Sequence, residues 1–563
     1  MTTDIKADMK ADTHLLDVRG LTINLPPGAD RPFAVEDLTF TLDHGEILCV
    51  VGESGSGKSM TAHAVMGLLP KAVKVSAGGI RHQGTDVLSL PERDQRALRG
   101  GRISMIFQEP MTALNPLMRV GDQIDEVLRY HTTLSRAARR ARVVELLASV
   151  GLPDPDHLRR SYPFRLSGGQ RQRVMIAMAL AVEPDILIAD EPTTALDVTT
   201  QKQILELIRE VQAKRRMGVM FITHDFGVVA EIAHRVAVMQ KGKLVEIGPA
   251  SEVLNRPKHP YTRQLIAAVP HLIEHREDFT RERKPVLTAE GVNKTFHIGG
   301  SMFRPGRTVV AGNNLSLTIH EGETVGLVGE SGSGKSTLGR SIVGLIKPDS
   351  GKILFEGVDL LSLSRPAFRP YRRHVQMVFQ DPYASLNPRH TVGDIITQGP
   401  VAFGEDRKRA LDKAKDLLKL VGLDASAADR FPHEFSGGQR QRISIARALA
   451  LEPKLLIADE PVSALDVSVQ AQVLDLLEDL RHRLNLSMLF ITHDLRVAAQ
   501  ICDTIAVMQK GSIVEIGPAR EVFGNPQHAY TRQLLDAIPG KGWTLPEDVV
   551  PASRRHAPVR NSA

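Results

Sequence analysis

An eight-residue, glycine-rich segment occurs twice in the chain without a single change. It spans Gly52–Ser59 and again Gly329–Ser336, and each copy follows an apolar run and precedes a stretch with a helical pattern. In this G-x-x-x-x-G-K-S/T spacing, glycines let backbone N–H groups face a phosphate, and the start of a helix adds partial positive charge. A simple glycine turn is the alternative. Two identical copies in this setting instead favour two sites for a nucleoside triphosphate.

The spacing also assigns the phosphate contacts within each segment. Lys58 and Lys335 are expected to reach the β- and γ-phosphates, while Ser59 and Ser336 are expected to ligate Mg²⁺. The predicted ligands are therefore ATP and Mg²⁺. The other predicted nucleotide contacts in these segments are Gly52, Ser54, Gly55 and Gly57 in the first copy, and Gly329, Ser331, Gly332 and Gly334 in the second.

Two carboxylates end a short apolar run in each copy, Asp190 and Glu191 in the first and Asp459 and Glu460 in the second. Successive side chains on an extended chain diverge, so the two carboxylates cannot do the same work. The first suits the Mg²⁺ shell, and the second can polarise an attacking water. A structural ion pair is the alternative. Behind a phosphate-binding segment, the pattern predicts hydrolysis with Glu191 and Glu460 as catalytic residues.

A histidine follows a further apolar run in each copy, His224 after residues 218–223 and His493 after residues 488–492. A lone histidine after a strand is usually structural. Its place behind a second strand of the nucleotide site favours a sensor of the γ-phosphate, so both histidines are predicted catalytic residues.

A second Ser-Gly-Gly segment opens a predicted helix in each copy, within LSGGQ at residues 166–170 and FSGGQ at residues 435–439. A helix start with a hydroxyl and unhindered N–H groups is another anion-binding end. Because each copy already has its phosphate segment, a second clamp implies a nucleotide shared between the copies. The predicted contacts are Ser167, Gly168, Gly169, Ser436, Gly437 and Gly438.

With this segment the chain resembles the ABC (ATP-binding cassette) ATPases, whose signature is LSGGQ, over nearly all residues from 16 to 538. The resemblance implies that Gln108 and Gln380 sense Mg²⁺ and contact a membrane partner. It also implies an aromatic stacked on adenine, which is Phe296 in the second copy. In the first copy the equivalent place holds Leu25, with Phe33 nearby as a substitute.

Two further repeated patterns resemble the peptide/nickel importer subfamily. They are FQ-x-P followed by LNP, at residues 107–116 and 379–388, and H-x-YTRQL, at residues 259–265 and 528–534. In physical terms the second pattern could be only a turn that feeds a surface helix. The resemblance implies a fused ATPase subunit that powers peptide import. The alternative is a soluble tandem ABC ATPase acting on ribosomes or nucleic acid. Dipeptides, oligopeptides, glutathione and nickel complexes all remain open as substrates.

Composition limits the remaining classes of protein. The chain has 563 residues, is 42% hydrophobic, carries a mild net charge of +6 and contains only two cysteines, Cys49 and Cys502. Two distant cysteines exclude a disulfide framework, a cysteine-type zinc site and the iron–sulfur cluster of some peptide-importer ATPases. No run approaches the roughly 18 apolar residues of a membrane span. The basic run at residues 136–142 reads as a solvated helix face rather than a nucleic-acid site.

The expected fold is α/β, with two tandem ABC-type P-loop ATPase domains. Each should have a mainly parallel sheet, an antiparallel β part and a helical subdomain, which in the first copy spans residues 114 to about 179. The predicted boundaries are a tail at 1–12, a domain at 13–270, a linker at 271–285, a domain at 286–540 and a tail at 541–563.

The resemblance also sets the expected partners and place of the chain. It implies two membrane permease subunits and a substrate-binding protein, no nucleic acid, and membrane contact only through the permease. The chain is expected on the cytoplasmic face of the inner membrane as a peripheral protein. We also expect the two cassettes to pair within one chain.

Overall fold

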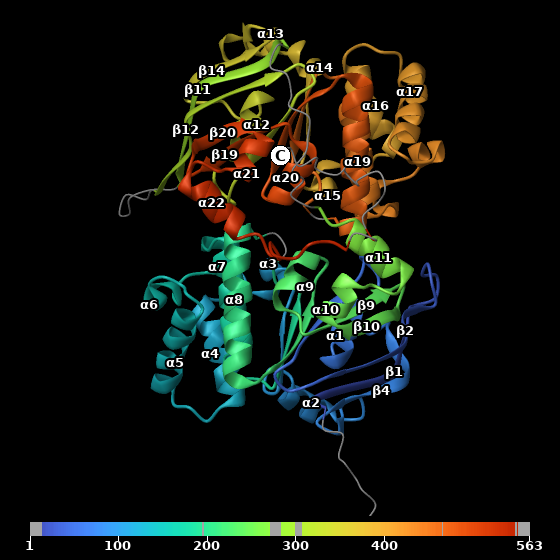
Figure 1. The fold of residues 1–563 in the computed structure, drawn as a ribbon, viewed down its shortest axis with the longest axis vertical. Coiled ribbons are helices and arrows are strands. Elements are labelled where there is room, and N and C mark those ends of the chain that lie inside the picture. The colour runs from blue at the N-terminus through green and yellow to red at the C-terminus, as the bar shows by residue number, and fades with distance from the viewer. Residues whose placement is uncertain are drawn as a thin grey trace, which may run out of the picture. The chain divides into compact units, whose positions relative to one another are not determined.

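The computed structural model describes residues 14–193, 196–270, 283–298, 307–463, 465–546 and 549. The chain forms two compact units (Figure 1). The first consists of Met1–Leu196, Thr200–Ala267 and Pro539–Ala563, and the second of Asp197–Thr199 and Ala268–Ile538. The predicted tail at 1–12, most of the predicted linker and most of the predicted C-terminal tail lie outside the described residues, so these boundaries remain predictions.

The first unit contains an antiparallel sheet in the order β2-β1-β4-β5 and a larger sheet in the order β10-β9-β3-β8-β7-β6. The larger sheet is parallel except for β10, which pairs antiparallel with β9. The strands are β1 Leu16–Asn24, β2 Phe33–Leu42, β3 Ile47–Val51, β4 Lys74–His82, β5 Thr85–Asp86, β6 Ile103–Ile106, β7 Ile186–Asp190, β8 Gly218–Ile222, β9 Arg235–Gln240 and β10 Lys243–Pro249.

Continuous apolar runs explain the larger sheet. Every residue of β3, β7 and β8 is buried, as expected for parallel strands covered on both faces. The helices are α1 Lys58–Val65, α2 Glu92–Leu98, α3 Pro110–Ala113, α4 Val120–His131, α5 Arg136–Ser149, α6 Pro155–Leu158, α7 Gly168–Ala179, α8 Val198–Arg215, α9 Phe226–Ile232, α10 Ala250–Asn255 and α11 Pro260–Ala267, with a 3₁₀ turn at Pro163–Arg165. Helices α4 to α7 form the predicted helical subdomain between β6 and β7 (Figure 1).

The second unit repeats this arrangement, with sheets in the orders β12-β11-β14-β15 and β16-β17-β18-β13-β19-β20. Its strands are β11 Pro285–Ile298, β12 Arg307–His320, β13 Thr324–Val328, β14 Ser350–Phe355, β15 Val358–Asp359, β16 Val375–Val378, β17 Leu455–Asp459, β18 Ser487–Thr492, β19 Thr504–Gln509 and β20 Ser512–Pro518.

The helices of the second unit follow in the same sequence. They are α12 Lys335–Ile342, α13 Arg365–Phe368, α14 Tyr371–His374, α15 Pro382–Ser385, α16 Val392–Ala402, α17 Arg407–Leu420, α18 Gly437–Leu449, α19 Val467–Leu484, α20 Leu495–Ile501, α21 Ala519–Gly524 and α22 Ala529–Asp536, with 3₁₀ turns at Leu360–Ser362, Ala425–Asp429 and Pro432–Glu434. The fold of both units confirms the predicted α/β architecture.

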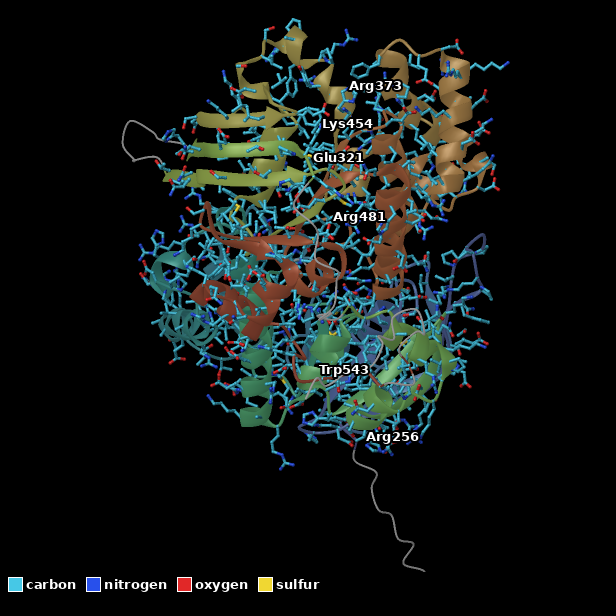
Figure 2. The ribbon with its side chains drawn as sticks, turned by 45° about the horizontal axis from the view of Figure 1, so that its top comes forward. Arg256, Glu321, Arg373, Lys454, Arg481 and Trp543 are labelled. Atoms are coloured by element: carbon cyan, nitrogen blue, oxygen red, sulfur yellow. The ribbon has the colours of Figure 1, made fainter. Side chains whose placement is uncertain are left out.

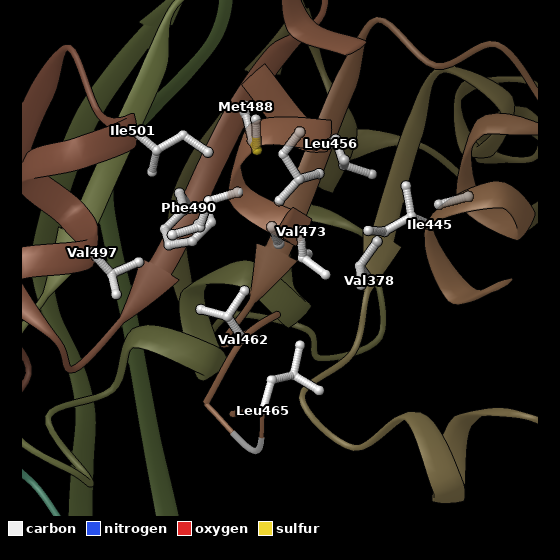
Figure 3. Packing of buried hydrophobic residues seen from close by; sticks show 14 of the residues in the cluster. Val378, Ile445, Leu456, Val462, Leu465, Val473, Met488, Phe490, Val497 and Ile501 are labelled. Carbon is white, nitrogen blue, oxygen red and sulfur yellow. The ribbon is translucent and has the colours of Figure 1, made fainter. Parts of the chain in front are cut away.

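The core of the second unit lies between its larger sheet and the flanking helices (Figure 3). Leu456 of β17 and Met488 and Phe490 of β18 pack with Ile445 of α18, and all four are fully buried. Both cysteines are also buried, Cys49 in the first unit and Cys502 in the second, and no disulfide joins them. Burial raises the pKa of the Cys49 thiol, which keeps it protonated and inert.

A buried ion pair ties α19 to the strand that leads into the second phosphate-binding segment. Arg481, labelled in Figure 2, is 9% exposed and donates to Asp503 Oδ2 at 2.7 Å and to Glu478 Oε1 at 2.9 Å. The same Asp503 oxygen accepts the backbone N–H of Thr324, the first residue of β13, at 2.8 Å. Arg481 therefore holds the base of the strand in place through one shared carboxylate.

We expect Arg481→Leu to destabilise the second unit by about 3 kcal/mol, because it leaves a buried carboxylate without its partner. Thermal unfolding of the full chain measures this loss of stability, and the transition of the second unit should have a lower melting temperature. Arg483→Leu is the control, since Arg483 is 62% exposed in its ion pair with Asp479 and should shift stability by less than about 1 kcal/mol. Equal melting temperatures for the two variants would contradict the prediction.

Candidate nucleotide site

Each phosphate-binding segment connects the end of a buried strand to the start of a helix. In the first unit it lies between β3 and α1, with Gly52 at φ 148° and Gly57 at φ 103°. A Cβ on Gly57 would come within 2.7 Å of the Ala34 carbonyl, and a Cβ on Gly52 would overlap the Met239 carbonyl. In the second unit a Cβ on Gly329 would overlap the Met508 carbonyl, and a Cβ on Gly334 would overlap the Ala311 carbonyl. The glycines are therefore required by the packing of the loop as well as by a phosphate.

The lysine of each segment folds back over its own loop. Lys58 Nζ donates to the carbonyls of Gly52 and Glu53 at 2.7 and 2.9 Å, and it is only 6% exposed. Lys335 makes the matching bonds in the second unit, and burial lowers the pKa of its ammonium. The outer side of the loop is open, since Ser54, Gly55, Ser331 and Gly332 are exposed. An anion bound there would give the buried ammonium a negative partner.

Of the residues predicted to bind or sense Mg²⁺, the serine and the aspartate lie together in each unit, while Gln108 and Gln380 donate to the catalytic-candidate glutamates. Ser59 Oγ donates to Asp190 Oδ1 at 3.1 Å, and Ser336 Oγ donates to Asp459 Oδ1 at 2.8 Å. Burial raises the pKa of both aspartates, and the serine bonds only partly offset it.

The second carboxylate oxygen of Asp459 is the best placed of these atoms to bind a cation. It is buried and has no hydrogen-bond partner among the described residues, and the Arg340 guanidinium is 3.9 Å away. A hydroxyl and an unsatisfied buried carboxylate oxygen are hard oxygen donors that fit Mg²⁺.

The predicted catalytic glutamates each contact two other predicted site residues. Gln108 Nε2 donates to Glu191 Oε2 at 2.9 Å, and His224 Nδ1 lies 3.4 Å from Glu191 Oε1. In the second unit Gln380 Nε2 donates to Glu460 at 2.8 Å, and His493 Nδ1 lies 3.2 Å from the same carboxylate. Glutamine, glutamate and histidine, which are far apart in the sequence, thus meet at one carboxylate in each unit.

The charge state of this cluster suits a base. Burial raises the pKa of Glu460, but the hydrogen bond and charge of His493 outweigh burial and hold that pKa below its usual range. Burial lowers the pKa of His493, and the Glu460 carboxylate outweighs it and raises that pKa. The pair therefore favours an ionised Glu460, which can accept a proton.

Both glutamates have a left-handed backbone, which the sequence did not indicate. The φ angle is 46° at Glu191 and 47° at Glu460, although neither is glycine. Strands β7 and β17 end one residue earlier, and the N–H of each glutamate donates to a carbonyl of the neighbouring strand, Ile222 or Ile491. The two carboxylates of a pair therefore diverge through a turn at the glutamate rather than through the alternation of an extended strand. Strain of this kind is typical of functional sites.

The two signature serines begin helices, as predicted. Ser167 caps α7 by accepting the Gln170 N–H at 3.2 Å, and its own N–H donates to Gln170 Oε1 at 3.1 Å. Ser436 and Gln439 form the same reciprocal pair at α18. The hydrogen bonds of these serines are with their own helices, whereas the residues around each phosphate loop contact one another. The helix starts are open to solvent, with Gly168 facing empty space.

The predicted adenine contact remains a prediction. Phe296 lies near the end of β11, partly buried, with Lys294 Nζ at 5.4 Å from its ring centre. In the first unit Leu25 packs partly buried against the core, and Phe33 begins β2.

The sequence analysis did not find a role for the tyrosines of the H-x-YTRQL patterns. Tyr261 accepts the backbone N–H of Glu53 at 3.1 Å, and Tyr530 accepts that of Glu330 at 3.2 Å, so each hydroxyl contacts the second residue of a phosphate loop. The alternative of a turn that merely feeds a surface helix is incomplete. The signal available in the sequence was that the pattern occurs once in each copy, at residues 259–265 and 528–534.

Together these sites define a class of protein. Residues 35–194 and 312–463 match the family model described as ABC transporter, so the chain belongs to the ABC transporter family and each unit is one of its ATP-binding cassettes. Residues 245–305 and 514–555 match a second model, described as oligopeptide/dipeptide transporter, C-terminal region. The prediction of a tandem ABC ATPase of the peptide-importer type is confirmed.

Curated relatives match almost the whole chain. The peptidoglycan transport ATP-binding protein YejF of Agrobacterium fabrum is 49% identical over 93% of this chain and 96% of its own length. The glutathione import ATP-binding protein GsiA of Pectobacterium atrosepticum is 45% identical over 96% of this chain and 92% of its own length. GsiA of Escherichia coli is 47% identical over 93% of this chain and 90% of its own length. The chain is thus an ABC transporter ATPase that binds ATP.

Proposed function

We propose that this chain is the ATP-hydrolysing subunit that powers import of peptides, or of related small solutes, through a separate membrane permease. Two C-terminal regions of the oligopeptide/dipeptide transporter type, one after each cassette, carry this proposal. Relatives named for transport of peptidoglycan and glutathione support it, since both names denote peptide-containing solutes. These matches do not support the alternative function, a soluble tandem ABC ATPase that acts on ribosomes or nucleic acid.

The chemistry follows from the cluster around each phosphate loop. Lys58 and Lys335 bind the phosphates from inside the loop, and the loop N–H groups bind them from its rim. Ser59 with Asp190, and Ser336 with Asp459, would hold Mg²⁺, which when bound neutralises charge on the phosphates. Glu191 and Glu460 accept the proton of the attacking water.

The remaining predicted residues orient these groups. Gln108 and His224 contact the two oxygens of Glu191, so a change in either would turn the carboxylate. Because the same glutamine belongs to the segment expected to meet the permease, motion of the permease can reach the base through one side chain. In the second unit Gln380 and His493 both contact Oε2 of Glu460 and would orient that carboxylate through this one oxygen.

The two cassettes are proposed to pair within one chain. Each cassette has one phosphate loop and one signature helix start, so head-to-tail pairing would complete two sites. ATP would close the pair and hydrolysis would reopen it, which drives alternating access in the permease.

The proposed partners are two permease subunits and a substrate-binding protein, without nucleic acid. Among the described residues, no helix combines the length and hydropathy needed to cross a membrane. An ATPase that powers a membrane permease would lie at the cytoplasmic face of the inner membrane, held there by the permease. Each unit has an exposed apolar side chain in the segment after its glutamine, Leu117 at 86% in the first and Tyr383 at 63% in the second, which is available for docking.

Affinity purification of the tagged chain from detergent-solubilised membranes tests this proposal. The expected result is recovery of two permease subunits, and uptake of labelled dipeptide or glutathione that stops when the gene is deleted. Leu117→Glu should reduce recovery of the permease without changing ATP hydrolysis by the purified chain. Consistent recovery of ribosomes or DNA in place of a permease would remove the importer function.

A further inference from the structure

One side chain from each C-terminal region reaches into a phosphate loop. The hydroxyl oxygen of Tyr261 accepts the N–H of Glu53 at 3.1 Å, and that of Tyr530 accepts the N–H of Glu330 at 3.2 Å. The tyrosines are 5% and 4% exposed, so neither bond competes with bulk water. The same contact therefore occurs twice, in two units that differ at many other positions.

The tyrosine is held in place by a fixed set of hydrogen bonds. In the first unit the Glu246 carboxylate, on β10, accepts the N–H groups of Lys258 and His259 at 2.9 and 3.0 Å. His259 Nδ1 then accepts the N–H of Tyr261, the second residue of α11, at 3.2 Å. Strand β10 thus positions the start of the helix, and the helix start positions the phenol.

The second unit builds the tyrosine position in the same way. Glu515, on β20, accepts the N–H groups of Gln527 and His528 at 2.7 and 3.1 Å. His528 Nδ1 accepts the N–H of Tyr530 at 3.2 Å. In H-x-YTRQL the histidine therefore fixes the start of the helix, and this helix start carries the tyrosine.

The residue that the tyrosine contacts is one of the two whose carbonyl oxygens hold the loop lysine. Besides donating to Tyr261, Glu53 accepts the N–H of Ser56 at 3.1 Å and the ammonium of Lys58 at 2.9 Å through its carbonyl. In the second unit the Glu330 carbonyl accepts the N–H of Ser333 at 3.2 Å and the ammonium of Lys335 at 2.8 Å. A shift of this residue would move the carbonyl that places the ammonium.

A purely space-filling role would need only the aromatic ring. Here the hydroxyl of both tyrosines meets the same backbone donor, and an unmet buried N–H is costly. Burial also raises the pKa of Tyr530 to about 12, so the phenol keeps its proton throughout the neutral range.

We propose that Tyr261 and Tyr530 are positioning residues for ATP binding, through which the C-terminal region of each cassette sets the geometry of its phosphate loop. They act through Glu53 and Glu330 on Lys58 and Lys335 and do not touch the reacting atoms. This inference depends on ATP binding by the cassettes and not on the transported solute.

The test is the double variant Tyr261→Phe, Tyr530→Phe in the full chain, with steady-state ATP hydrolysis measured over a range of ATP concentrations. We expect KM for ATP to rise about tenfold while kcat stays within about twofold, because a loosened loop weakens binding without removing the base. Hydrogen–deuterium exchange should also be faster in the peptides that cover residues 52–59 and 329–336.

Tyr371→Phe is the matched control, because this tyrosine packs edge-to-face on Phe355 in the second unit, away from the loop residues named above. It should leave KM for ATP unchanged. Unchanged KM and unchanged exchange in the double variant would overturn the proposal. A lower melting temperature with unchanged KM would overturn it too, since it would show that the hydroxyls only stabilise the fold. Both readouts use the purified chain, so a failed importer function would not affect them.

Discussion

Replacing Glu191 and Glu460 together by glutamine should leave ATP bound and slow its turnover by at least about 100-fold, or about 2.7 kcal/mol of barrier. Glutamine keeps the shape of the side chain but cannot take a proton from water. Both glutamates receive a hydrogen bond from an adjacent glutamine amide, at 2.9 and 2.8 Å, and a glutamine carbonyl can still accept it. The loss should therefore be in kcat, with ATP affinity preserved.

Single-turnover hydrolysis and equilibrium binding of labelled ATP measure the two effects separately. Glu210→Gln is the control for the chemical change alone, since Glu210 lies in an exposed ion pair with Lys214 on α8. It should hydrolyse ATP at the unaltered rate. Unchanged hydrolysis in the double variant would remove the assignment of these glutamates as the bases.

Ser436→Arg is expected to reduce ATP labelling at the Lys58 loop by at least about tenfold, or ~1.4 kcal/mol, and to spare the Lys335 loop. The reason is the proposed head-to-tail pairing, in which the second signature helix completes the first phosphate site. Ser436 caps α18 at an exposed helix start. In the proposed pairing, a large side chain there would occupy the place of the γ-phosphate.

The Ser436→Arg change is made in the glutamine double variant, so that the closed state persists. This protein is labelled with a photoreactive ATP analogue, and the labelled peptides are then mapped. Ser167→Arg is the mirror variant and should reduce labelling at Lys335 instead. If each variant loses labelling at the loop of its own unit, the cross-pairing is wrong.

Much of the fold could be predicted because its determinants are local. Buried parallel strands such as β3 and β7 read as continuous apolar runs, and a glycine-rich loop between strand and helix marks a phosphate site. The signature Ser-Gly-Gly segments were predicted to open helices, and the structure adds that the serine side chain caps the helix in both.

The missing parts depend on contacts between distant segments. No local pattern indicates that Gln108 would bond Glu191, since 83 residues separate them. The contact of Tyr261 with Glu53 spans 208 residues, and the motif around the tyrosine reads equally well as a helix start. The left-handed backbone of Glu191 could not be predicted, because glutamate, unlike glycine, has no preference for that conformation.

That backbone conformation restricts how the proposed catalytic position can change over evolutionary time. A β-branched residue such as valine or threonine is disfavoured at a φ near 46°, by about 1–2 kcal/mol, whereas asparagine, aspartate and glycine accept it more readily. Neutral drift away from glutamate should therefore pass through small polar residues or glycine. A cassette that loses its base in this way would keep its fold and its phosphate loop, and a tandem chain could then retain one half as an ATP-binding partner for the other.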